Sequence, residues 1–100
     1  MSVSRLAKGN HIIVMYKYVE DILARREPFR EAHLNHWTGY LTKGLAGAGP
    51  YLNPTDFGIY FFQTENRDMV NDAVSNDPYM TAGLIQSHEI REMNVTIAQD

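Results

Sequence analysis

Two segments of this chain are apolar on both of the faces that an extended strand presents. Residues 11–18 (HIIVMYKY) and 57–63 (FGIYFFQ) are rich in β-branched and aromatic side chains, which predicts strands. Successive side chains of a strand point to opposite sides of a sheet, so Ile12 and Val14 oppose Ile13. Both faces of the sheet must therefore be covered. A chain of 100 residues has little core for this purpose, because it buries only about two thirds of the surface that its unfolded form exposes.

Two amphipathic helices are predicted from the residues between the strands. After a charged bend (YVEDILARRE), Pro28 suits the first turn of a helix over residues 28–43. A second helix is expected to begin after Asn66 as its cap and to stop before Pro78. At ~100° per residue, one side of the first helix forms a stripe predicted to be buried. Its members are Arg30, His33, Leu34, Trp37, Tyr40 and Leu41.

The order of elements predicts the fold class. Short strands are expected at residues 45–52 and 88–97, with a turn at 53–55 and Gly83 available for a left-handed conformation. The resulting order βαββαβ is that of an α+β, ferredoxin-like fold, in which an antiparallel sheet carries both helices on one face. We expect a single domain over residues 11–100, preceded by a disordered or loosely held leader.

The second face of the sheet then needs a cover that the chain does not supply. The simplest cover is a second copy in a twofold dimer. A pocket between the sheet and this partner is the expected ligand site.

Charge and motifs exclude several classes of function. The net charge is −3 and the nine Lys and Arg residues are scattered, so nucleic acid is not an expected partner. The sequence has no cysteine, which removes disulfides and thiolate metal sites. No apolar stretch suits a membrane helix or a secretory signal, so the cytoplasm is the default location. The segment GLAGAGP does not have the order of a dinucleotide fingerprint, and no cofactor is expected.

Three segments resemble the YCII-related domain family. They are Arg-Glu-Ala-His-Leu at 30–34, Gly-Ala-Gly-Pro at 47–50, and Asp-Pro-Tyr-Met-Thr-Ala-Gly-Leu at 77–84. The resemblance runs over residues 11–97 and implies a ferredoxin-like fold that dimerises into an α/β barrel, with a histidine and an aspartate as a catalytic pair. By motif position these residues are His33 and Asp77. Some members resemble dehydrochlorinases that act on chlorinated hydroxyquinols.

Acid/base chemistry is the function that this pair would support. A neutral imidazole can take and return a proton near neutral pH, and an aspartate that accepts its other N–H fixes its tautomer. Taken from the residues alone, His33 is also interpretable as a hydrogen-bonded core histidine. Asp77 is likewise interpretable as the end of a helix before Pro78.

Further side chains are candidates for substrate binding. Arg30, one turn before His33, could clamp an anion or instead pair with a nearby acid. Tyr16 and Tyr60 could donate to a developing oxyanion, and Trp37 lies on the same stripe as His33. His33 with His36 is a weak metal pair without a carboxylate at ligand spacing, and no metal is expected.

The predicted function is therefore proton transfer on a small cyclic or phenolic substrate, as in elimination, isomerisation or hydrolysis, by a homodimer. The alternative is a non-catalytic dimer that binds a metabolite in the same cleft. Oxygenase-like or haem-binding activity stays open by analogy with other dimeric ferredoxin-like families.

Overall fold

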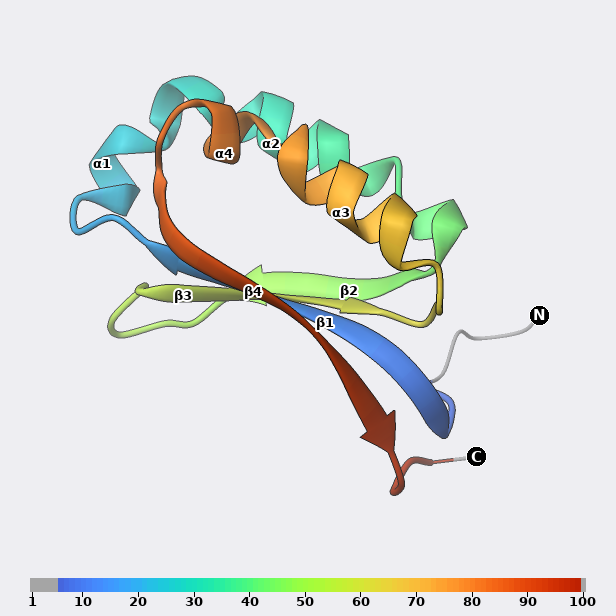
Figure 1. The fold of residues 1–100 in the computed structure, drawn as a ribbon. Helices are drawn as coiled ribbons and strands as arrows, with labels where there is room; N and C mark the ends of the chain where they lie inside the picture. The colour runs from blue at the N-terminus through green and yellow to red at the C-terminus, as the bar shows by residue number, and fades with distance from the viewer. Residues whose placement is uncertain (1–5, 100) are drawn as a thin grey trace.

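The computed structural model describes residues 6–99 as an antiparallel sheet with all helices on one side (Figure 1). In chain order the elements are β1 (Gly9–Tyr18), α1 (Ile22–Arg25), η1 (Glu27–Phe29), α2 (Arg30–Thr38), η2 (Leu41–Lys43), β2 (Leu45–Pro50), β3 (Phe57–Phe62), α3 (Arg67–Ser75), α4 (Pro78–Thr81) and β4 (Ile85–Val95). Residues 1–5, which form half of the expected leader, lie outside the described part. Gly9 and Asn10 belong to β1, so this strand begins two residues earlier than predicted.

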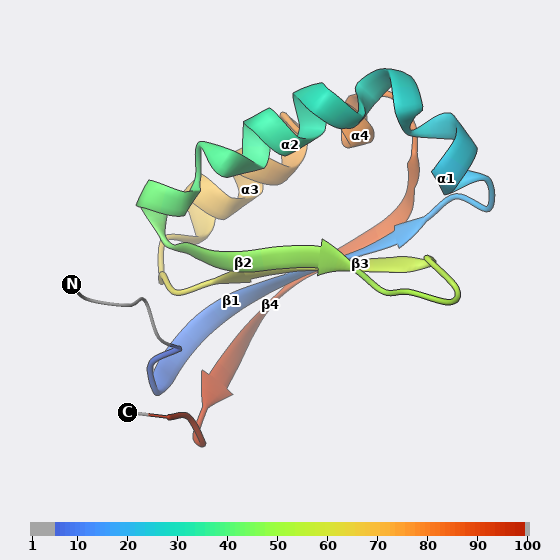
Figure 2. The same cartoon turned by 180° about the vertical axis from the view of Figure 1, so that it is seen from behind.

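The sheet has four strands in the order β2-β3-β1-β4, and every neighbouring pair is antiparallel. The register places Val14 opposite Tyr60 on β3 and opposite Ile90 on β4. Seen from behind, α2 and α3 run across the same face of the sheet (Figure 2). This arrangement confirms the predicted α+β, ferredoxin-like fold.

The two faces of the sheet differ in how far they are buried. On the helix side, Ile12, Val14 and Phe62 are at most 1% exposed and form the centre of the core. On the opposite side, Ile13 and Phe61 are only partly buried within the chain. Among residues 6–99 no helix covers the apolar side chains of this second face, as the two-sided strands predicted.

The first long helix is shorter and buries a narrower stripe than predicted. The segment expected at residues 28–43 divides into η1, α2 and η2. The α-helix ends at Thr38, because the next residue, Gly39, has low helix propensity. His33 and Trp37 are buried, but Leu34 and Leu41 are 48% and 55% exposed. The prediction that these two leucines are buried is wrong, since the helix is rotated so that His33 and Trp37 face the sheet.

Several boundaries also differ from the prediction. The charged bend contains the short helix α1, whose Ile22 packs into the core. The single-turn helix α4 follows the predicted end of the second helix, and Gly83 has the left-handed conformation (φ 74°) that was predicted for it. Asn66 caps α3 as predicted, its side-chain oxygen accepting from the Met69 backbone N–H at 3.1 Å. Within residues 6–99, no helix is long and apolar enough to cross a membrane.

Candidate active site

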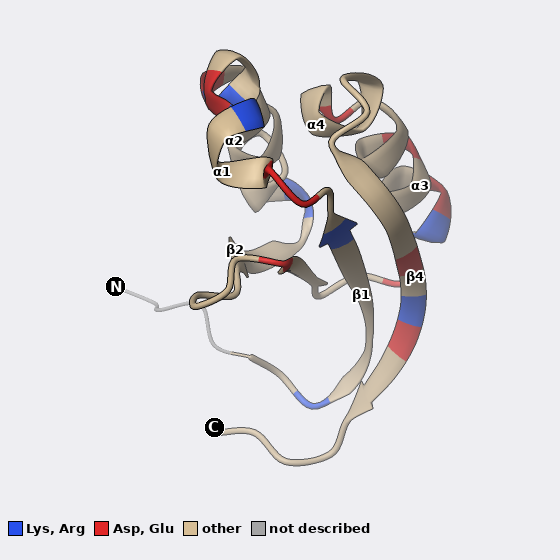
Figure 3. Ribbon diagram, turned by 90° about the vertical axis from the view of Figure 1, so that its left-hand side faces the viewer, with Lys and Arg blue, Asp and Glu red and all other residues tan. Residues whose placement is uncertain are grey.

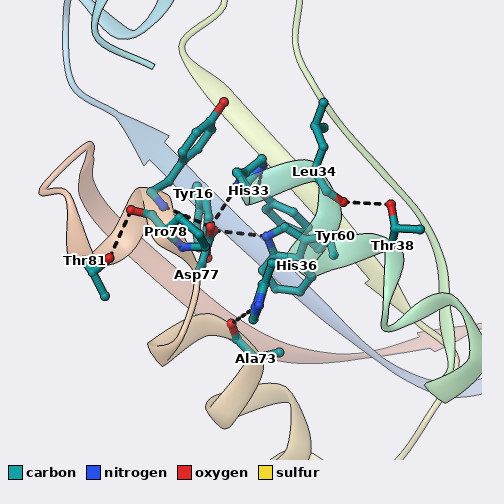
Figure 4. Close-up of polar contacts among 12 residues, drawn as sticks. Tyr16, His33, Leu34, His36, Thr38, Tyr60, Ala73, Asp77, Pro78 and Thr81 are labelled. Carbon is teal, nitrogen blue, oxygen red and sulfur yellow. Dashed lines mark hydrogen bonds and ion pairs between the residues drawn. The ribbon is translucent and has the colours of Figure 1, made fainter. Parts of the chain in front are cut away.

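The carboxylate of Asp77 is the centre of a buried polar cluster on the helix side of the sheet (Figure 4). Asp77 precedes Pro78 and has the extended backbone that proline imposes on its predecessor (φ −65°, ψ 127°). It caps α4 by accepting from the Tyr79 backbone N–H at 3.0 Å. Its side chain is 0% exposed, so every hydrogen bond to it must come from the protein interior.

Three side chains from other elements complete the bonding of this carboxylate. His33 Nδ1 donates to Asp77 Oδ1 at 2.7 Å, while Tyr16 Oη and Trp37 Nε1 donate to Oδ2 at 2.8 and 3.1 Å. His33 and Trp37 are four residues apart on α2, so both point to the same side of the helix. Tyr16 reaches Asp77 from β1 below. The cluster thus joins α2, β1 and the start of α4.

The hydrogen bonds keep Asp77 ionised. Burial alone raises the pKa of this carboxyl, but the hydrogen bond and charge of His33 lower it, and bonds from the Tyr79 N–H and the Tyr16 hydroxyl lower it further. The net result is a pKa below its ordinary value of 3.8. Asp77 is therefore an anion at neutral pH, and it accepts four hydrogen bonds without donating any.

An ionised Asp77 determines the tautomer of His33. Because the carboxylate can only accept, the hydrogen between the two side chains belongs to His33 Nδ1. In the neutral ring the lone pair then lies on Nε2, which faces the Tyr60 hydroxyl at 3.4 Å. The ring is held flat against Tyr79, with 3.6 Å between ring centroids and 6° between planes. His33 is therefore a base of fixed orientation that is 7% exposed.

The tyrosines around this pair are neutral donors. Burial and the neighbouring Asp77 charge raise the pKa of Tyr16 well above its ordinary 10.0. Burial and the nearby Tyr18 raise the pKa of Tyr60 in the same way. The Tyr18 ring lies edge-on to Tyr16 and also lines a surface hollow of ≈ 600 Å³ at the end of β1. Its hydroxyl reaches over Gly58, where an added Cβ would collide with it.

The structure brings most of the predicted site residues together. His33, Asp77, Tyr16, Tyr60 and Trp37 lie on the helix side of the sheet, because the buried stripe of α2 packs against the sheet of its own chain. The hydroxyl of Tyr16 and the indole N–H of Trp37 donate hydrogen bonds to Asp77, so in this structure both groups bind the carboxylate.

Two contributors were absent from the sequence-based prediction. Tyr79 stacks on His33, and its position directly after Asp77-Pro78 was the available signal for a role at the site. Arg26, one turn before Arg30, was treated as part of a charged bend. Both arginines act electrostatically on Tyr79 and lower its pKa, although burial raises it by more.

The second histidine of α2 has a separate, structural contact. His36 Nε2 donates to the Ala73 carbonyl oxygen at 2.7 Å and so ties α2 to α3. Residues 6–99 contain no group of three His, Cys, Asp or Glu side chains that could hold a metal ion.

Fold and site together define a ferredoxin-like α+β domain with a buried His–Asp pair between its helices and its sheet. The model of the YCII-related domain matches residues 11–94, and the chain belongs to that family. No curated protein matches the chain.

Solved structures of the same fold are similar over most of the chain. One is 5-chloro-2-hydroxyhydroquinone dehydrochlorinase from Burkholderia phenoliruptrix AC1100 in complex with 2,5-dihydroxybenzoquinone, at 22% identity and a TM-score of 0.70 over 81% of this chain and 90% of that one. Another is a protein from Agrobacterium tumefaciens, at 12% identity and a TM-score of 0.55 over 85% of this chain and 91% of that one. At these identities the likeness shows the fold.

Proposed function

We propose that this protein is a small homodimeric enzyme in which His33, oriented by Asp77, transfers a proton on a small cyclic or phenolic substrate. The reaction class that we favour is elimination of the dehydrochlorinase type. The observation that carries this proposal is the 2.7 Å bond from His33 Nδ1 to an Asp77 carboxylate that is buried and fully hydrogen-bonded.

A structural histidine would not need this arrangement. Besides His33, three donors converge on Asp77 and hold one carboxylate oxygen against His33, while the stacked Tyr79 fixes the plane of the ring. Such support orients a base and stabilises the imidazolium that forms when it accepts a proton. The lone pair of Nε2 is left facing the phenolic Tyr60 instead of a backbone carbonyl.

The elimination step can be written with these groups. Nε2 of His33 removes a proton from the substrate while chloride leaves with the electron pair of the carbon–chlorine bond, and the charge of Asp77 stabilises the imidazolium. The neutral Tyr60 hydroxyl, 3.4 Å from Nε2, can donate to a developing oxyanion beside the reacting proton. The proton then passes from Nε2 to water, so the net reaction is loss of HCl.

The uncovered face of the sheet supports the homodimer. Ile13 and Met15 on β1 and Ile59 and Phe61 on β3 lie on this face and are only partly buried. Charged positions on β4 border it, as Figure 3 shows for the red and blue segments of that strand. An apolar centre with a polar rim is typical of an interface between copies of a chain.

The activity test is release of chloride from a panel of chlorinated and hydroxylated aromatic compounds that includes 5-chloro-2-hydroxyhydroquinone. We expect turnover by the wild type and a loss of about 10²–10⁴-fold in kcat for His33→Gln and for Asp77→Asn. His36→Gln is the matched control on the same helix, since His36 contacts Ala73 and not Asp77. If both site variants retain wild-type turnover, the assignment is wrong. Binding of these compounds without turnover would favour the non-catalytic alternative.

A further inference from the structure

Two arginines at the start of α2 have no acidic partner. Arg26 precedes η1, and Arg30 is the first residue of α2, one helical turn later. Among residues 6–99 the one ion pair joins His33 to Asp77, so neither guanidinium is paired with a carboxylate there. The Nε atoms of both arginines are buried and have no hydrogen-bond partner within the same residues. A buried donor on a charged group is unfavourable unless an acceptor meets it.

Both guanidinium groups lie beside the candidate active site. Arg30 is one turn before His33 on α2, so the two side chains share a side of the helix. The positive charges of Arg26 and Arg30 both act on the hydroxyl of Tyr79, whose ring is stacked on His33. Two cations without an ion-pair partner among residues 6–99 therefore lie near Tyr79, the residue that stacks on His33.

Among residues 6–99 the nearby acidic residues form no ion pair with either arginine, although the charge of Glu27 also acts on the Tyr79 hydroxyl. Glu27 and Glu31 alternate with the arginines in the sequence, and red and blue segments adjoin at the α1–α2 turn in Figure 3. Both glutamates are exposed, and with Arg30 they border an open hollow of ≈ 490 Å³. A ligand in solvent can thus reach Arg30 from this hollow.

We propose that Arg26 and Arg30 together bind the oxyanion of a small aromatic ligand, a carboxylate or a phenolate. The planar guanidinium presents its N–H groups in a fork that matches such oxygens, and it is weakly hydrated, so it suits a partly buried anion. The inference deepens the function proposed above, because it states the charge of the ligand that the His33 site takes. It also gives the buried Nε–H groups of both arginines an acceptor.

The test is an NMR titration that observes the Nε–Hε signals of the arginines directly. Benzoate and 4-nitrophenolate are the two anionic probes, and benzamide is the neutral control with the shape of benzoate. We expect the Arg26 and Arg30 signals to shift and saturate with at least one of the anions, which also distinguishes a carboxylate ligand from a phenolate. Benzamide should leave both signals in place. The proposal is overturned if neither anion saturates these signals, or if benzamide shifts them equally.

Variants separate this site from the proposed proton transfer. Arg26→Lys and Arg30→Lys keep the positive charge and remove the planar pair of guanidinium N–H groups. Each should weaken binding of whichever anion, benzoate or 4-nitrophenolate, the wild type binds more tightly, by about tenfold or more. Arg25→Lys, at the exposed neighbouring position, should bind like the wild type. His33→Gln should lose turnover and still bind the anionic probe. Equal binding by Arg26→Lys, Arg30→Lys and wild type would refute the role of the arginines. If a lysine variant does not fold, the comparison of benzoate with benzamide on the wild type still decides the question.

Discussion

Replacement of Asp77 by asparagine tests the buried cluster with the smallest change in shape. Asparagine has one acceptor oxygen, and its NH₂ group occupies the place of the other. The Tyr16 hydroxyl can rotate to accept from this NH₂, and a neutral His33 can present a lone pair to it. The Trp37 indole N–H and the Tyr79 backbone N–H can only donate.

The magnitude follows from where these two fixed donors lie. Trp37 contacts Oδ2 and the Tyr79 N–H contacts Oδ1, so either orientation of the amide leaves one of them buried without an acceptor. An unsatisfied buried donor costs about 1–3 kcal/mol. This is a large part of the roughly 5–15 kcal/mol by which a typical domain is stable. Asparagine caps helices as well as aspartate does, so loss of the cap does not add to this cost.

The assay is urea unfolding at one fixed protein concentration, followed by the fluorescence of the single tryptophan, Trp37. Asp77→Asn should lower the free energy of unfolding by about 1–3 kcal/mol. Asp72→Asn is the matched control at an exposed position of α3 and should stay within about 0.5 kcal/mol of the wild type. If Asp77→Asn is equally close to the wild type, the carboxylate is not the acceptor on which this cluster depends.

Three further predictions concern pH, packing and assembly. The difference in unfolding free energy between wild type and Asp77→Asn should be present above pH 3.8, the ordinary pKa of the Asp77 carboxyl. It should disappear as the pH falls through the lowered pKa of the folded state. Urea unfolding over an acid pH series measures this difference, and its persistence at the lowest pH would contradict the prediction. Gly58→Ala should lower the free energy of unfolding by about 1–3 kcal/mol, because the added Cβ would displace the buried Tyr18 hydroxyl. Thermal unfolding measures this effect, and an unchanged melting temperature would contradict the contact between Gly58 and Tyr18. Ile59→Lys should elute as a monomer in light-scattering chromatography, whereas Leu52→Lys, in an exposed loop, should stay dimeric; a wild-type monomer would end the dimer proposal.

Much of the fold was predictable because alternation along β1 and β3 is a local property of the sequence. The Asn66 cap and the left-handed Gly83 were predictable for the same reason. The face of α2 that is buried was not fully predictable, because the apolar residues of this helix allow several rotations about its axis. The rotation is set by the bonds of His33 and Trp37 to Asp77, which lies more than 35 residues away in sequence.

The candidate site was predictable in its members and less so in its contacts. His33 and Asp77 followed from motif position. The engagement of Tyr16 with Asp77 joins residues 61 apart in sequence, and no spacing rule indicates such a pair. The short helix α4 was missed because one turn of helix gives too little periodicity to detect. It is nevertheless the element that fixes Asp77 as a cap and presents Tyr79 to His33.

In the proposed mechanism, Asp77 holds His33 as a base with its lone pair on Nε2. A long-range ¹H–¹⁵N spectrum of the histidine rings, recorded on the neutral form, reports directly which nitrogen carries the proton. We predict a protonated Nδ1 and an unprotonated Nε2 for His33 in the wild type, and loss of this preference in Asp77→Asn. A wild-type His33 with its proton on Nε2 would contradict the account, because no lone pair would then be available to a substrate.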